Sequence, residues 1–203
     1  MLLKYHLILN KKHLWARGEV MNQVDPIRDL EEIKEMYKVL QSKSQRDYLL
    51  FKFAIHTGVK LNELLNLTVA DVIASDQLIK SFWVEEHATN INIVIPEDLQ
   101  QDLTEFIATE QLVTSDLLFQ STRTHKGLSR QQAYRIIHAA AEELGMVHIG
   151  LTTLRKTFAY HAYQSGISIS IIQKYLGHQT TYETMKFIGI SRNASKTTIA
   201  LNL

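Results

Sequence analysis

The sequence has no cysteine, and this absence excludes several kinds of chemistry at once. Without thiols the chain has no disulfide framework, no thiolate metal site and no cysteine nucleophile. Nine histidines are present, but they are scattered and form no HExxH motif and no close ligand pair with a carboxylate. We therefore expect no metal and no other cofactor.

Long apolar runs and a strong net charge are missing as well. No apolar stretch reaches the roughly 18 residues of a membrane span. Lys4, His6, Lys11 and Lys12 interrupt the amino-terminal segment, which makes it a poor signal peptide. We expect a cytoplasmic protein with no membrane partner. The net charge of +1 does not by itself indicate a nucleic-acid-binding protein, so any such role must rest on local residues.

What the chain does contain is helical periodicity around a modest apolar core. With 203 residues and 45% hydrophobic content, it can bury one sizeable core. Gly58 is predicted to end one helix, and Ser129 with Gln132 forms a capping box that begins another. Apolar residues recur at helical spacing in the segments 30–40, 45–56, 60–67, 96–110, 129–144, 153–164, 169–176 and 181–188.

Two β-like runs complete the pattern. Residues 78–84 and 91–95 flank the polar stretch EEHATN, which is typical of a hairpin. The expected fold class is therefore mostly α with a small antiparallel β-sheet (α+β). We divide the chain into a linker or amino-terminal arm (1–25), one domain (26–190) and a carboxy-terminal tail (191–203).

Three strings in this domain carry a family resemblance. They are HTGVKLNELLNLTVADV (56–72), TTLRKTFAYHAYQSG (152–166) and IIQKYLGHQTTYETMKFIGI (171–190), with the hairpin and a PEDL helix start between the first two. In this order they resemble the signature boxes of the tyrosine recombinase, or phage integrase, family. The resemblance spans roughly residues 26–190 and implies the fold of that family's catalytic domain, its carboxy-terminal DNA-binding half.

The resemblance also implies a reaction, from which this chain departs at several positions. In the family a tyrosine hydroxyl attacks a DNA phosphate while arginines, a lysine and histidines stabilise the charge. Here Phe187 stands in place of the tyrosine, Lys60 in place of the first arginine and Thr152 in place of a histidine. The hairpin turn, where the family carries its lysine, reads His87-Ala88-Thr89-Asn90, and Lys80 on the preceding strand comes too early to replace it.

The positions that are kept suggest binding to DNA. Lys60, Arg155 and His178 retain the means to hold a backbone phosphate. Alternatives that need no DNA are a solvated Lys60, an Arg155 paired with Glu63, and a His178 that satisfies a helix end. Further expected contacts to double-stranded DNA, all basic residues near these boxes, are Lys126, Arg130, Arg135 and Lys156.

These observations favour a protein that is not an enzyme. We expect no catalytic residues, with Lys60, Thr152 and Phe187 as degenerate positions, and a DNA-binding regulator or repressor of a prophage or other mobile element. One alternative is an active or residually active tyrosine recombinase in which Tyr182 or Tyr175 attacks. Another is an interaction module that modulates a recombinase, or forms a homo-oligomer, through its tail.

Overall fold

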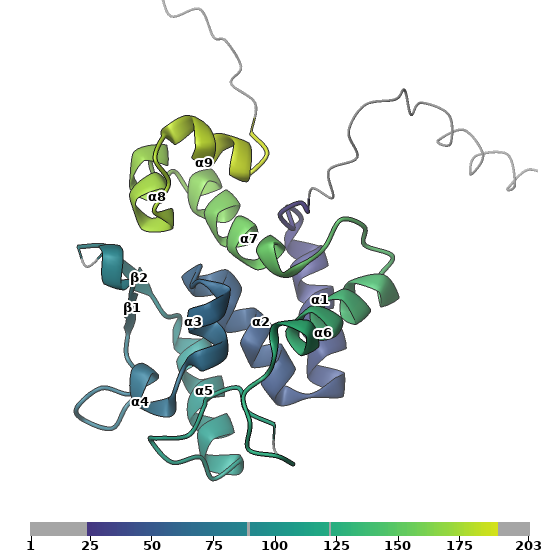
Figure 1. Cartoon of the computed structure of the whole chain (residues 1–203), viewed down its shortest axis with the longest axis vertical. Helices are drawn as coiled ribbons and strands as arrows, with labels where there is room; N and C mark the ends of the chain where they lie inside the picture. Colours follow the sequence, from purple (N-terminus) through teal and green to yellow (C-terminus); the bar gives the residue numbers. More distant parts are fainter. Residues whose placement is uncertain (1–23, 89, 122, 191–203) are drawn as a thin grey trace, which may run out of the picture.

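The computed structural model describes residues 24–88, 90–121 and 123–190 (Figure 1). The predicted tail and nearly all of the predicted amino-terminal arm lie outside these residues. In chain order the elements are α1 (Leu30–Lys43), α2 (Gln45–Thr57), α3 (Leu61–Asn66), α4 (Val69–Val72), β1 (Phe82–Val84), the 3₁₀ helix η1 (Glu86–Ala88), β2 (Asn92–Val94), α5 (Glu97–Thr109), α6 (Arg130–Glu143), α7 (Leu151–Gln164), α8 (Ile169–Leu176) and α9 (Thr181–Phe187).

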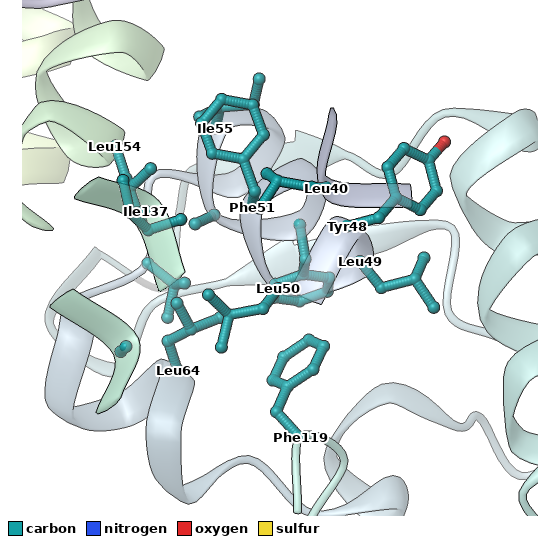
Figure 2. Packing of buried hydrophobic residues seen from close by; sticks show 14 of the residues in the cluster. Leu40, Tyr48, Leu49, Leu50, Phe51, Ile55, Leu64, Phe119, Ile137 and Leu154 are labelled. Atoms are coloured by element: carbon teal, nitrogen blue, oxygen red, sulfur yellow. The ribbon is translucent and has the colours of Figure 1, made fainter. Parts of the chain in front are cut away.

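Helix α2 is the centre of the molecule. It packs against α1, α5 and α7, and most of its residues are buried, because its sequence is apolar on nearly every side. Leu50 and Phe51 lie in the main core with Leu64, Phe119 and Leu154, which come from later parts of the chain (Figure 2). Because α3 and α7 both contribute to this main core, their positions relative to each other are fixed.

Lys52 is a buried charged side chain in the middle of this mostly apolar helix. The Lys52 side chain is 5% exposed, and its Nζ lies 2.7 Å from Asp98 Oδ2 and 2.7 Å from Asp102 Oδ2, both on α5. Tyr48 Oη donates to the same Asp102 oxygen. The paired carboxylates allow this ammonium to be buried, and they join α2 to α5.

A second, smaller core joins the tip of the hairpin to the carboxy-terminal helices. It contains Ala88 of η1, Ala159 of α7, Ile172 and Tyr175 of α8, and Ile188 just after α9. Figure 1 shows α7, α8 and α9 stacked together at one end of the molecule, with the β1–β2 hairpin at the side of α3. Because η1 packs on α8, residues of the hairpin come to lie beside α7 and α8.

The expected fold class is confirmed, and the expected helices are present with small shifts at their ends. The Ser129–Gln132 capping box is formed, and Gly58 ends α2 with a left-handed φ of 65°. The strands are shorter than predicted: only Phe82–Val84 and Asn92–Val94 pair, antiparallel, with Trp83 opposite Ile93. The helices α4 and η1 were not predicted, because single turns leave no periodic pattern.

In the described part of the chain, no helix is long and apolar enough to cross a membrane. Nor do the described residues contain a cluster of three or more histidine, aspartate or glutamate side chains suited to hold a metal ion.

Candidate nucleic-acid interface

Lys60 is placed by the tight turn that ends α2. A Cβ on Gly58 would stand 2.3 Å from Cδ1 of Phe158, so this residue must be glycine for two reasons, its positive φ and the close approach of α7. Two residues later, Lys60 occupies the N-cap position of α3. Its Nζ lies 3.3 Å from Glu63 Oε1, 3.6 Å from Glu85 Oε2 and 3.1 Å from His87 Nδ1. The lysine side chain keeps 41% of its surface exposed, so it can also meet a ligand.

Arg155 is half-buried on α7, and not all of its hydrogen-bond donors have partners. Its Nη2 donates over 3.4 Å to the carbonyl oxygen of Tyr175 and over 3.5 Å to that of Leu176. Its buried Nε has no hydrogen-bond partner among the described residues. Glu63, the alternative partner expected from the sequence, pairs with Lys60 instead. A guanidinium with long bonds and an unused donor is suited to receive an anion.

His87 ties the hairpin to α8. A carbonyl oxygen can only accept, so His87 Nε2 carries the proton and donates to the Tyr175 carbonyl oxygen over 2.8 Å. Its Nδ1 then accepts from Lys60, 3.1 Å away. Gly177, which ends α8 with φ of 73°, leaves room for the imidazole, since a Cβ there would lie 3.3 Å from His87 Nε2. The Tyr175 carbonyl is therefore shared by His87 and Arg155.

His178 lies at the junction between α8 and α9. Its Nδ1 lies 3.0 Å from Thr184 Oγ1, and its ring packs edge-on against Phe187 at 5.0 Å between centroids. Burial lowers the pKa of His178, and the positive charge of Arg155 lowers it further. The imidazole is therefore neutral at pH 7. Thr184 Oγ1 donates to the Thr180 carbonyl oxygen, so His178 Nδ1 donates to Thr184 Oγ1 and the neutral ring leaves Nε2 as an acceptor.

Phe187 and the two tyrosines considered as alternative nucleophiles, Tyr175 and Tyr182, have distinct surroundings. Phe187 is half-buried and packs on His178, so it holds the end of α9 but has no hydroxyl. Tyr175 is buried, and its hydroxyl donates to the Thr57 carbonyl oxygen inside the core. Tyr182, in the first turn of α9, is 67% exposed.

The remaining candidates lie apart from this group. Lys156 is buried, with its Nζ 2.7 Å from the Val24 carbonyl oxygen and 5.3 Å from the centre of the Phe187 ring. Thr152 is exposed at the start of α7. Exposed Lys126, Arg130 and Arg135 belong to α6 and the loop before it, and no contact in the described structure joins them to Lys60 or Arg155. Lys80 Nζ donates to the Asp71 carbonyl oxygen over 2.7 Å.

Two residues of the site were missed by sequence reasoning. Glu85 and His87 were taken as part of a polar hairpin turn, yet both lie against Lys60. The available signal was weak: Glu85 directly follows the β-run that ends at Val84, and buried acids in such places need a partner. Contact with α8 depends on packing across 88 residues of sequence, which no local pattern encodes.

Comparison with known proteins settles the family. The profile of the phage integrase family matches residues 28–193, which is most of the chain. The chain belongs to the phage integrase family.

Relatives of this integrase-family chain differ in how much of their length it spans. It is 40% identical over 178 residues to the probable integrase/recombinase YoeC of Bacillus subtilis, and the match covers 87% of this chain and 95% of YoeC. The tyrosine recombinase of Pseudothermotoga lettingae is 29% identical over 160 residues, 77% of this chain and 54% of the relative. The type 1 fimbriae regulatory protein FimE of Escherichia coli K12 is 30% identical over 149 residues, 70% of this chain and 73% of FimE.

Solved structures show the same fold. The XerA recombinase superposes with a TM-score of 0.66 and 21% identity, covering 89% of this chain and 64% of XerA. A lambda integrase dimer bound to a core site superposes with a TM-score of 0.56 and 19% identity, covering 94% and 67% of the two chains. At these identities the likeness establishes the tyrosine recombinase catalytic-domain fold.

One expectation from the sequence is corrected by these findings. We expected the chain not to be an enzyme, but the family is one of enzymes and several relatives are named tyrosine recombinases. The expectation rested on Phe187, which has no hydroxyl, together with Lys60, Thr152 and a hairpin turn without lysine. These departures remove one route for attack and weaken others, but they do not remove the chain from its enzyme family.

Proposed function

We propose that this chain binds duplex DNA through Lys60, Arg155 and His178, and that it acts in DNA recombination. The observation that carries the proposal is that His87 links the two cations: it contacts partly exposed Lys60 and shares the Tyr175 carbonyl oxygen with Arg155, whose own bonds to α8 are long. Several of the similar solved structures are recombinases bound to DNA, which supports a DNA ligand.

A backbone phosphate fits the chemistry of this group. Arg155 can donate from its guanidinium and Lys60 from its ammonium, whereas His178 donates from Nε2 only when its ring is protonated, because Nδ1 is bound to Thr184 Oγ1. Donors of this kind fix the register of a protein on the duplex and do not read its sequence. Base contacts must come from other surfaces, for which exposed Arg130 and Arg135 on α6 are candidates.

Strand breakage by this chain needs a hydroxyl from a residue other than Phe187. The Tyr175 hydroxyl is committed to Thr57 in the core. Tyr182 is exposed on the same helix as Phe187, though about 140° around it at 100° per residue. We assign the attacking hydroxyl to Tyr182, which requires α9 to present its first turn to the phosphate.

The proposal is tested by measuring affinity for duplex DNA over a range of salt concentrations. Fragments of the source genome are the ligand, and single-stranded DNA of the same sequence is the comparison. We expect duplex binding that weakens steeply with salt, because each phosphate contact releases about one counterion. Absence of duplex binding at low salt would overturn the proposal.

A regulatory role is the second candidate, and the relationship to FimE favours it. FimE is named a regulatory protein, and its match spans 73% of its length. A regulator must prefer its site over bulk DNA by roughly a thousandfold or more. Selecting bound fragments from the genome and locating them relative to promoters separates this role from recombination, for which the selected sites are instead the ends of a mobile segment.

A further inference from the structure

Glu85 is a buried acid in the middle of the proposed phosphate site. It lies at the end of β1, and its side chain is fully buried. Neither carboxylate oxygen has a hydrogen-bond partner among the described residues. The nearest cations are Lys60 Nζ at 3.6 Å and, when protonated, His87 Nδ1 at 3.5 Å. A buried carboxylate without hydrogen bonds is costly when ionised, so the site favours its neutral form.

The surrounding charges come from every element that packs on Glu85. Burial raises the pKa of Glu85, and the Glu63 carboxylate on α3 raises it further. The positive charges of Arg155 on α7 and Lys60 before α3 act in the opposite direction. Tyr175 on α8 is neutral, and His87 of η1 has its Nδ1 3.5 Å from Glu85 Oε2. Both cations proposed to hold the phosphate therefore act on this carboxyl group.

We propose that binding of a DNA phosphate at Lys60 and Arg155 is coupled to uptake of one proton by the neighbouring buried Glu85. This inference rests on the proposed function. An ionised Glu85 would repel a phosphate held by Lys60 and Arg155, strongly so in a site shielded from water. Protonation removes the repulsion, because the neutral carboxyl group carries no charge.

Protonation, rather than movement away, follows from how the hairpin is held. Two residues beyond Glu85, His87 donates to the Tyr175 carbonyl oxygen and lies against Gly177. Ala88 is buried in the core between α7 and α8. Moving the backbone at Glu85 away would disturb both contacts, whereas a proton leaves them intact.

The experiment compares wild type with Glu85→Gln, using a generic duplex of fixed length from about pH 5 to about pH 8, where a carboxyl group with a raised pKa titrates. Wild-type affinity should fall by up to about tenfold per pH unit as Glu85 ionises. Glu85→Gln should bind more tightly at the upper end and lack this part of the pH dependence, because the amide stays neutral. The difference between the two proteins reports the titration of Glu85 together with its effect on His87, whose Nδ1 lies 3.5 Å from Glu85 Oε2.

The matched control is Glu105→Gln, the same change at an exposed position on α5. It should shift affinity slightly at every pH and leave the pH dependence as in wild type. If wild type and Glu85→Gln bind equally with equal pH dependence, the inference is wrong and the proposed function stands. If neither binds duplex DNA at any pH, the proposed function fails and the inference with it.

A second measurement needs no variant and covers the case in which Glu85→Gln does not fold. Calorimetric titration of wild type with duplex, in two buffers of different ionisation enthalpy, gives the number of protons taken up. We expect about one proton on the alkaline side of the Glu85 titration. No net uptake across the pH range would overturn the inference.

Discussion

At the scale of single residues, Phe187 stands where the family has its nucleophilic tyrosine, and its ring keeps contacts with neighbouring side chains. Phe187 keeps the ring that packs on His178 but has no oxygen. Lys156 is buried, with its Nζ bonded to the Val24 carbonyl oxygen and 5.3 Å from the centre of the Phe187 ring, and its expected contact with DNA stays a prediction. The residues that we propose to contact a phosphate are Lys60, Arg155 and His178.

Tyr182 is predicted to carry any covalent link to DNA. Its hydroxyl is exposed, whereas that of Tyr175 is bound in the core. Incubation with nicked suicide duplexes, followed by denaturing gels, should show an adduct that Tyr182→Phe abolishes. The control Tyr134→Phe removes an exposed hydroxyl on α6 and should leave the adduct unchanged. An adduct that survives Tyr182→Phe would show that another residue attacks.

Glu85 is predicted to make the stability of the protein depend on pH. The pKa of Glu85 is raised in the folded state, so the native protein binds a proton that the unfolded chain has already lost. Wild-type stability, measured against Glu85→Gln, should therefore fall as pH rises from about 4.3, the ordinary glutamate value, through the raised folded-state pKa. Denaturant midpoints over this range test it, and parallel curves for the two proteins would refute it.

At the scale of elements, the helices could be predicted from sequence and their meeting points could not. Apolar periodicity with Ser129 and Gly58 as boundaries located α2 and α6 closely. The placement of η1 on α8 depends on a small core formed by Ala88 and Tyr175, which are distant in sequence. For that reason Arg155 and Lys60 were predicted as site residues from their boxes, while Glu85 and His87 were missed.

The α2–α5 contact gives a prediction at this scale. Lys52 is buried between Asp98 and Asp102, so Lys52→Ala should lower the free energy of unfolding by roughly 3–5 kcal/mol, because it leaves acidic groups unpaired and a cavity behind. Asp98 is 67% exposed, and Asp98→Ala should cost about 1 kcal/mol or less. Urea unfolding checks both. Equal losses for the two variants would mean that the buried pairing is not what stabilises this contact.

At the scale of the whole molecule, the site is assembled from four separate parts of the chain. The turn after α2 supplies Lys60, the hairpin supplies Glu85 and His87, α7 supplies Arg155, and the α8–α9 junction supplies His178. The chain spans nearly all of YoeC but about half of the Pseudothermotoga tyrosine recombinase. Duplex binding can therefore be measured directly on this chain.

The central claim is that Lys60 and Arg155 hold a DNA phosphate, and the salt dependence of duplex binding in alanine variants tests it most directly. Lys34→Ala, which removes an exposed lysine on α1, is the control of equal charge. Folding must be verified for Arg155→Ala, because Arg155 bonds two carbonyl oxygens of α8.

Folded Lys60→Ala and Arg155→Ala should each bind specific and non-specific duplexes more weakly by similar factors. Each should also make the plot of log affinity against log salt shallower by about one unit, because one fewer counterion is released. Lys34→Ala should leave affinity and slope close to wild type. Unchanged affinity and slope in both folded site variants would contradict the account.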